Sequence, residues 1–305
     1  PPRSTLFPYT TLFRSGSWNE VSHLKLPMSI TAMNVGDIDN DNVAEVVIGT
    51  RDKILRLYKY INNQFTEIAT QKLLDPINDI TIGDAFNKNQ PQIVFSAGKF
   101  LYFYSYVRNQ LKEDDNLRQP RDISKIYVGD IDNDNANDIL FGGRWNEIQL
   151  IQYKSRFFQQ MKAKLHIDYY VRAIIAHDIN NDGMKELIFS TADGKFGIYS
   201  YSNGTFLPLF TKAYKGTINC FSISTAFMPQ KTVICLGSTA KELILFEVNG
   251  GQIIEAPPII VDSPINTLNF TIIQGQKQTD LLVGCESGEI LYFNLVETTG
   301  KKKKK

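Results

Sequence analysis

The chain has 305 residues and a net charge of +1, and its apolar and charged fractions, 43% and 21%, are those of a soluble globular protein. A charge so close to zero gives no electrostatic reason to expect binding to nucleic acid or to an acidic membrane surface. No window of 18 uninterrupted apolar residues occurs, so we expect no transmembrane helix. Cys220, Cys235 and Cys285 lie in or beside apolar runs, which is typical of buried free thiols and favours an intracellular compartment.

The two ends of the chain differ in character from the rest. Residues 1–17 begin without methionine, and most of this segment, "PPRSTLFPYTTLFRS", resembles translated sequencing-adapter read-through. Residues 300–305, "GKKKKK", resemble a translated poly-A tract or a basic tag. We therefore predict that the native fold covers residues 18–299, and a signal peptide upstream of them would not be visible in this sequence.

A repeat of about 47 residues organises the region between these ends. Six units can be aligned on the last residue of a shared motif, and the steps between these residues are 47, 46, 48, 47 and 47. The aligned residues are Gly49, Ser96, Gly142, Ser190, Gly237 and Gly284. Spacing this regular predicts six copies of one supersecondary unit.

The first unit predicts four strands in chain order. An apolar-rich run (29–36) precedes an acidic loop, and a short buried strand follows (45–50). Residues 53–60 alternate between apolar and polar, as in a half-buried strand, and the more polar 64–73 suits an outer edge. The later units contain equivalents of the alternating third strand at 99–107, 147–154, 195–202, 242–248 and 289–296.

Four-stranded units of this length in one array predict an all-β fold, a single β-propeller. Residues 18–37 align with 63–84, so the chain begins on a fourth strand, and it ends after the third strand of the sixth unit. A first strand that completes the last blade would close the ring, and residues 18–299 number 282, or six times 47. We therefore favour six blades; the alternative is a seven-bladed propeller cut short.

An acidic loop follows the first strand in three units, and its spacing suits Ca²⁺. Numbering the loop from 1, positions 1, 3, 5 and 9 carry oxygen-bearing side chains, and position 7 can offer its backbone carbonyl. Position 6 is a residue type that tolerates positive φ. The ligands predicted for two to three structural ions are Asp37, Asp39, Asp41, Val43 and Glu45; Asp130, Asp132, Asp134, Ala136 and Asp138; and Asp178, Asn180, Asp182, Met184 and Glu186.

The alternative to an ion site is a solvated acidic turn. An EF-hand is excluded, because position 12 is apolar and strands flank the loop. The second, fifth and sixth units lack most of these carboxylates and should bind no ion, yet they keep the strand pattern. The blade should therefore fold on packing alone, with a metal only stiffening the loop.

The D-x-D-x-D-x-x-x-[DE] loop followed by an apolar run and glycine resembles the FG-GAP/VCBS repeat of integrin-α-type β-propellers. The resemblance covers about 280 residues and implies structural Ca²⁺ ions on one face. The order of acidic and degenerate blades is loosely similar to intracellular FG-GAP scaffold proteins of the KICSTOR type. The chain departs from integrin-α in lacking the "FG…GAP" consensus in most units and any visible cysteine pairing.

No catalytic constellation accompanies the repeats. The three histidines do not cluster in sequence, and no phosphate loop or nucleophile elbow appears. We therefore predict a non-enzymatic, Ca²⁺-stabilised scaffold that binds protein partners through the face opposite the acidic loops, with Arg144, Trp145, Arg51 and Arg121 as candidate contacts. The alternatives are a secreted adhesion or glycan-binding module, for which Asn203 and Asn269 offer acceptor sequons, and a propeller-type polysaccharide lyase.

Overall fold

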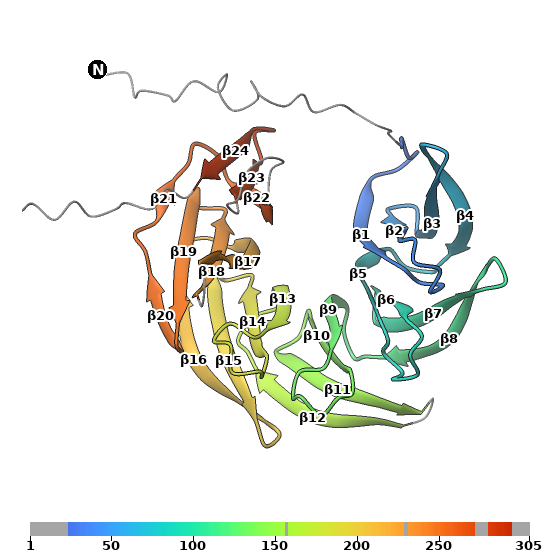
Figure 1. Cartoon of the computed structure of the whole chain (residues 1–305), viewed down its shortest axis with the longest axis horizontal. Helices are drawn as coiled ribbons and strands as arrows, with labels where there is room; N and C mark the ends of the chain where they lie inside the picture. Colours follow the sequence, from blue (N-terminus) through green and yellow to red (C-terminus); the bar gives the residue numbers. More distant parts are fainter. Residues whose placement is uncertain (1–23, 156–157, 229–230, 272–279, 295–305) are drawn as a thin grey trace, which may run out of the picture.

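The computed structural model describes residues 24–155, 158–228, 231–271 and 280–294. It confirms an all-β propeller of six blades, arranged around a common centre (Figure 1). The first strand of each blade lies innermost, and the following strands pair outward in sequence order. Among the described residues, no helix has the length and apolar composition needed to cross a bilayer.

The blade boundaries follow the 47-residue repeat. Blades 1 to 3 consist of β1 (Ile30–Gly36), β2 (Glu45–Thr50), β3 (Ile54–Ile61) and β4 (Gln64–Lys72); β5 (Ile77–Gly83), β6 (Gln92–Ala97), β7 (Phe100–Val107) and β8 (Gln110–Arg118); and β9 (Ile123–Gly129), β10 (Asp138–Gly143), β11 (Glu147–Ser155) and β12 (Phe158–His166). Blades 4 to 6 consist of β13 (Val171–His177), β14 (Glu186–Thr191), β15 (Lys195–Ser202) and β16 (Thr205–Ala213); β17 (Ile218–Met228), β18 (Lys231–Ser238), β19 (Glu242–Asn249), β20 (Gln252–Glu255) and β21 (Ile259–Ile260); and β22 (Ile265–Thr271), β23 (Asp280–Cys285) and β24 (Ile290–Asn294).

Blade 5 departs from the four-strand prediction, whereas the described part of blade 6 has the three strands expected of its own unit. The fourth strand of blade 5 is divided, because β20 and the two-residue β21 both pair with β19. Residues 18–23 of the predicted closing strand lie outside the described residues, and residues 24–29 form no strand, so closure of the ring by the N-terminal segment stays a prediction.

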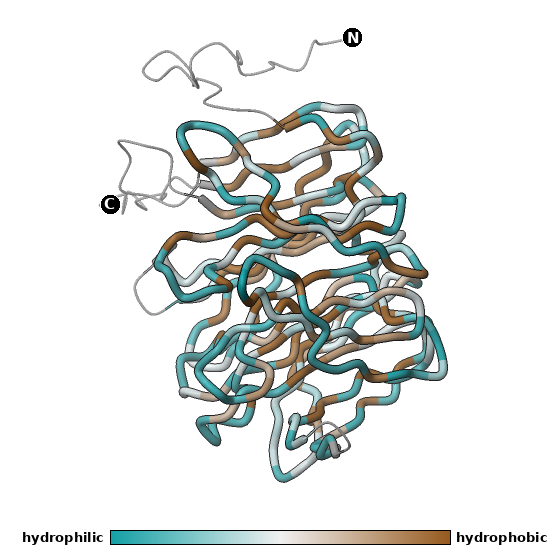
Figure 2. Tube along the Cα trace, turned by 90° about the vertical axis from the view of Figure 1, so that its right-hand side faces the viewer, coloured by the Kyte–Doolittle hydropathy of each residue, from teal (hydrophilic) through white to brown (hydrophobic). Residues whose placement is uncertain are grey.

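The hydrophobic core lies between blades rather than within them. Each cluster of buried apolar side chains joins two consecutive blades: Val47 and Leu57 of blade 1, for example, pack with Ile80 and Phe95 of blade 2. Figure 2 shows the apolar stretches gathered in the strands and hydrophilic stretches in the loops. Because every core cluster is shared by neighbours, a blade depends on the blades beside it for its stability.

One small residue in each second strand makes this close packing fit. An added Cβ at Gly49 would lie 2.8 Å from Ile77 Cβ, and one at Gly142 would lie 2.6 Å from Val171 Cγ2. The aliphatic residue that begins each inner strand thus occupies the space over the aligned glycine of the preceding blade. Of the two serines at this position, Ser190 donates from Oγ to the Ile218 carbonyl at 3.1 Å, whereas Ser96 Oγ is buried without a hydrogen-bond partner among the described residues.

Polar residues add hydrogen bonds at the same junctions. Asn78 Nδ2 donates to the Ile123 carbonyl at 2.9 Å, and Ser124 Oγ donates to the Val171 carbonyl at 2.8 Å. Asn219 Nδ2 repeats the bond at the last described junction, to Ile265 at 3.2 Å. These buried or half-buried carbonyls would otherwise lack a partner beyond their own sheet, so the bonds fix the register between blades.

The first blade carries the same aliphatic face without a blade packed on it. Ile30, Met33 and Val35 on β1 are 52%, 57% and 54% exposed, whereas the equivalent Ile77 and Ile80 on β5 are 1% and 4% exposed. Figure 1 shows β1 facing the sixth blade across an opening in the ring. The described structure is therefore an arc of six blades with five packed junctions.

We predict that Ile77→Ala lowers the free energy of unfolding by about 2–5 kcal/mol, because it leaves a cavity over Gly49. The matched substitution Ile30→Ala should cost less than about 1 kcal/mol, since that side chain is half exposed. Urea unfolding of both variants measures the difference. An equal loss in the two variants would mean that the β1 face is covered in solution, as in a closed ring.

Candidate functional site

The acidic loops join the first and second strands of blades 1, 3 and 4, and backbone hydrogen bonds to position 1 shape each of them. Asp37 accepts hydrogen bonds from the N–H groups of Asp41 and Asn42 at 3.1 and 2.8 Å. Asp130 and Asp178 accept the same two bonds in their loops. Position 6 has positive φ as predicted, at Asn42, Asn135 and Gly183.

Positions 2 and 9 anchor each loop to the core. Ile38 at position 2 is 1% exposed, and its N–H donates to the Glu45 Oε2 atom at 3.0 Å. The Glu45 side chain itself is fully buried at the start of β2. Ile131 with Asp138, and Ile179 with Glu186, repeat this arrangement at 3.2 and 3.0 Å.

Blade 2 keeps the loop with most of its carboxylates absent. Asp84 accepts hydrogen bonds from the N–H groups of Lys88 and Asn89, and Gln92 replaces the position-9 acid and accepts from Phe86 N–H at 3.2 Å. Asn87 and Asn89 have positive φ, as do the matching residues of the acidic loops. In blade 2 the bond to position 9 thus comes from position 3, whereas the position-2 N–H of Ala85 donates to the Gly83 carbonyl at 2.9 Å. The four loops therefore share the two backbone bonds to position 1 and the positive φ at positions 4 and 6. The acids at positions 3 and 5 are not needed for this conformation and are free for another role.

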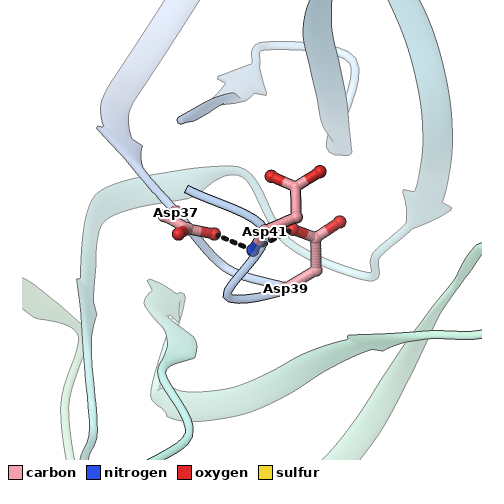
Figure 3. A group of neighbouring side chains, drawn as sticks. All are labelled: Asp37, Asp39 and Asp41. Carbon is pink, nitrogen blue, oxygen red and sulfur yellow. Dashed lines mark hydrogen bonds between the residues drawn. The ribbon is translucent and has the colours of Figure 1, made fainter. Parts of the chain in front are cut away.

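In blade 1 these acids gather into a cluster. Asp37, Asp39 and Asp41 each offer a carboxylate oxygen within 4.8 Å of the others, a group that could hold a metal ion (Figure 3). The Lys59 ammonium, from β3, lies 2.9 Å from Glu45 Oε1 and 3.5 Å from Asp39 Oδ2, and it also contacts Asp41. The hydrogen bonds that Lys59 donates to Asp41 and Glu45 raise its pKa, so the ammonium stays charged.

Blade 3 builds a second cluster of the same kind. Asp130, Asp132 and Asp138 bring carboxylate oxygens within 4.8 Å of one another. The Lys162 ammonium contacts Asp132 and lies 2.9 Å from Asp134 Oδ2 and 3.2 Å from Asp138 Oδ1. Burial opposes the charge on Lys162, but its hydrogen bonds to these acids outweigh burial and raise its pKa.

The loop of blade 4 has no lysine among its described contacts. Asp178 at position 1 keeps its backbone bonds, while the Asn180 side-chain amide donates to Asp182 Oδ2 and Glu186 Oε1 at 3.0 and 3.1 Å. Glu186 is 1% exposed, and burial raises its pKa to about 7. At neutral pH this loop therefore holds a buried acid that is only partly ionised.

Ca²⁺ suits the oxygen donors of these loops, and in blades 1 and 3 three carboxylates of each loop converge within 4.8 Å. In those two blades, however, a lysine ammonium already contacts the carboxylates at positions 3, 5 and 9, and a divalent ion would have to displace it. In blade 4 no lysine contacts the loop acids among the described residues, but Asp178, Asp182 and Glu186 do not converge in the same way, and the Asn180 amide nitrogen faces two of them. The position-7 residues Val43, Ala136 and Met184 contribute an N–H to the position-5 carboxylate in each loop.

Neighbouring loops are tied together through position 8. The Asn137 side chain donates to the Asp84 carbonyl at 3.0 Å and receives a bond in return, since Asn87 Nδ2 donates to the Asn137 carbonyl. Lys185 Nζ donates to the Asp130 carbonyl at 2.8 Å. The loops of blades 2, 3 and 4 thus form one connected layer on this face.

The opposite face contains the candidate partner contacts. Arg51, Arg121 and Arg144 are exposed there, in loops that join the second to the third strand or one blade to the next. Trp145 is half-buried: its ring lies 6.2 Å from Phe141 and packs against the core between blades 2 and 3. The structure therefore offers Arg144, rather than Trp145, to solvent.

Two adjoining hollows, of about 380 and 360 Å³, also open on this face. Asn78 and Asp122 line both of them. The second hollow takes residues from four consecutive blades, among them Lys125, Arg144 and Arg172. Concave surface and exposed positive charge therefore coincide near the inner ends of blades 2 to 5.

The two lysines of the acidic clusters were not among the residues predicted from the sequence. Lys59 could have been found, because antiparallel register places it opposite Glu45. Lys162 had no such signal: it lies on the outer strand, at the bulge where β12 skips a partner on β11.

Comparison with solved structures supports the fold. The chain is similar to BBS1N in crystals of its complex with ARL6DN: with a lead soak the TM-score is 0.64 at 14% identity, covering 87% of this chain and 78% of that one, and with a mercury soak it is 0.63. It is also similar to Sqt1 of Saccharomyces cerevisiae, with a TM-score of 0.65 and 14% identity over 87% of this chain and 72% of that one. Comparisons with protein families and with curated proteins gave no match.

We predict that Glu186 contributes a pH-dependent part to stability. Its folded pKa, about 7, exceeds the ordinary value of 4.5, so the contribution is complete below pH 4.5 and is lost as the pH rises through 7. The difference corresponds to about 3 kcal/mol. Chemical unfolding in the presence of a chelator should show a smaller decline between pH 5 and 8 in Glu186→Gln than in the unmodified chain. Parallel pH profiles for the two would contradict the assignment.

Proposed function

We propose that this propeller is a non-enzymatic interaction scaffold that binds a protein partner on the face opposite the acidic loops. The observation that carries the proposal is the pair of adjoining hollows on that face, lined from several blades and bordered by exposed arginines. A site that is lined by several blades exists only in the assembled propeller, so partner binding would require the blades to be correctly packed. The fold likeness to BBS1N, which was crystallised in complex with ARL6DN, is consistent with such a role.

The residues proposed for contact are Arg51, Arg121 and Arg144, together with the second hollow. Arginine contributes to binding through both a planar charged group and an apolar stem, which makes it frequent at the centre of interfaces. Trp145 belongs to the proposal as a support, because its ring packs beneath this surface and fills space beside Gly143.

Calcium enters the proposal at the fourth blade. Among the described parts of the three acidic loops, this is the one whose carboxylates have no lysine ammonium in contact; the Asn180 amide donates to two of them and would have to turn its oxygen toward an ion. An ion there would pair with the buried Glu186 and connect β13 to β14. The FG-GAP-like pattern of the loops supports this assignment, and the ion would have a structural rather than a catalytic task.

We predict that Ca²⁺ raises the melting temperature of the purified chain, because a ligand that binds only the folded state adds about 2.7 kcal/mol at a hundredfold excess over Kd. The rise should disappear in Asp182→Asn/Glu186→Gln, which removes two proposed ligands. Differential scanning calorimetry with and without chelator provides the measurement. A rise of the same size in the double variant would exclude the fourth-blade site.

We predict that the double variant Arg121→Glu/Arg144→Glu recovers its protein partners at least tenfold less than the unmodified chain does. The measurement is quantitative mass spectrometry of the proteins that co-purify with the full chain from its native cells. Two reversed charges at the centre of a protein interface cost several kcal/mol. The matched control is Arg108→Glu/Lys112→Glu, which makes the same charge change at the β7–β8 turn on the other face. If the control loses the partners and the first variant keeps them, the binding face is the one with the acidic loops.

A further inference from the structure

One lysine ammonium accompanies each acidic loop that has four carboxylates. In blade 1, Lys59 contacts the acids at loop positions 3, 5 and 9, and in blade 3, Lys162 contacts the acids at the same three positions. Both lysine side chains are largely shielded from solvent, at 15% and 8% exposure. The two ammonium groups therefore stand at corresponding places, where the carboxylates of each loop converge.

The two lysines reach this place from different strands. Lys59 lies on the third strand of its blade, directly opposite Glu45. Lys162 lies on the fourth strand, at a bulge: Ala163 pairs with Leu150 and Met161 with Ile151, which leaves Lys162 between them. The repeat alone cannot explain a cation delivered from two unrelated positions. The shared feature is the acidic cluster that each one contacts.

Blades 2 and 4 lack a lysine at both positions, and they also lack the full set of acids. In the register between the second and third strands, the residues opposite loop position 9 in blades 1 to 4 are Lys59, Ser105, Gln152 and Ser200. The residues at the fourth-strand bulge in blades 1 to 4 are Ile68, Asp114, Lys162 and Leu209. Blade 2 has a single loop acid of the four, and blade 4 has three. Within this one chain, a lysine occurs where, and only where, a described loop has four carboxylates.

The geometry points to Lys59 and Lys162 as built-in counter-cations: we propose that each ammonium takes the place of a divalent ion, so that the loops of blades 1 and 3 assemble without metal. The fully buried oxygens Glu45 Oε1 and Asp138 Oδ1 support this role. Neither accepts a hydrogen bond from another described group, and each lies within about 3 Å of its lysine, at 2.9 and 3.2 Å. Ca²⁺ could enter either loop only by displacing a paired lysine.

The experiment uses the full chain in the Asp182→Asn/Glu186→Gln background, which removes two ligands of the proposed fourth-blade site and makes the result independent of the calcium proposal above. Isothermal titration calorimetry measures Ca²⁺ binding to metal-free protein. With both lysines present, we expect no binding tighter than about 1 mM. Lys59→Gln and Lys162→Gln should each gain one Ca²⁺ site at least tenfold tighter than that, and the double variant should gain two.

Control variants separate loss of the ammonium from a general effect of mutation. Lys164→Gln removes a more exposed lysine, 50% exposed, two residues from Lys162 on the same strand, and it should gain no site. Lys59→Arg and Lys162→Arg keep the positive charge and should also gain none. Ca²⁺ binding at micromolar concentration by the background chain with both lysines intact would overturn the proposal, and that measurement requires no lysine variant to fold. Gln variants that fold but gain no site would overturn it equally.

Discussion

An aliphatic side chain at the start of each inner strand packs over a glycine or serine in the second strand of the preceding blade, and the rest of the fold depends on this contact. It sets how closely two twisted sheets approach, and it places the polar residue that follows within reach of the next blade's backbone. Because the contact joins consecutive blades, each core cluster is shared between two repeats. Stability is accordingly a property of junctions more than of single sheets.

The same periodic signal made much of the fold predictable from the sequence. A small residue at a fixed step marks each second strand, and alternation marks each third strand, so blade number and strand order followed directly. The loops were predictable where the backbone dictates them: asparagine and glycine at position 6 do adopt positive φ.

Side chains that reach the site from other strands were not predictable. Lys162 comes from a bulge on an outer strand, and a bulge shifts register in a way that no local pattern of residue types encodes. Trp145 was predicted as a contact on the partner-binding face, but neighbouring blades half-bury it, and packing of that kind depends on the assembled tertiary structure.

The acidic loops illustrate how one backbone conformation accommodates different charge. Backbone bonds to the position-1 aspartate shape each loop, and the position-9 side chain accepts from position 2 in blades 1, 3 and 4 and from position 3 in blade 2, where it is the amide of Gln92. The remaining positions are therefore free to vary in charge from blade to blade. Acids at chelating spacing thus indicate where positive charge is required. In blades 1 and 3 a lysine on a neighbouring strand contacts these acids.

The hydrogen bonds between loops have a consequence for the other face of the molecule. Asn137 and Lys185 connect the loops of blades 2, 3 and 4, and these are three of the four blades whose inner ends line the second hollow. Fastening the blades at one rim limits how far they can tilt at the opposite rim. A partner that enters the hollow would then bind a surface whose blades lose little further conformational freedom on binding. For the proposed partner, the loop layer would reduce the entropic cost of association without touching the bound molecule.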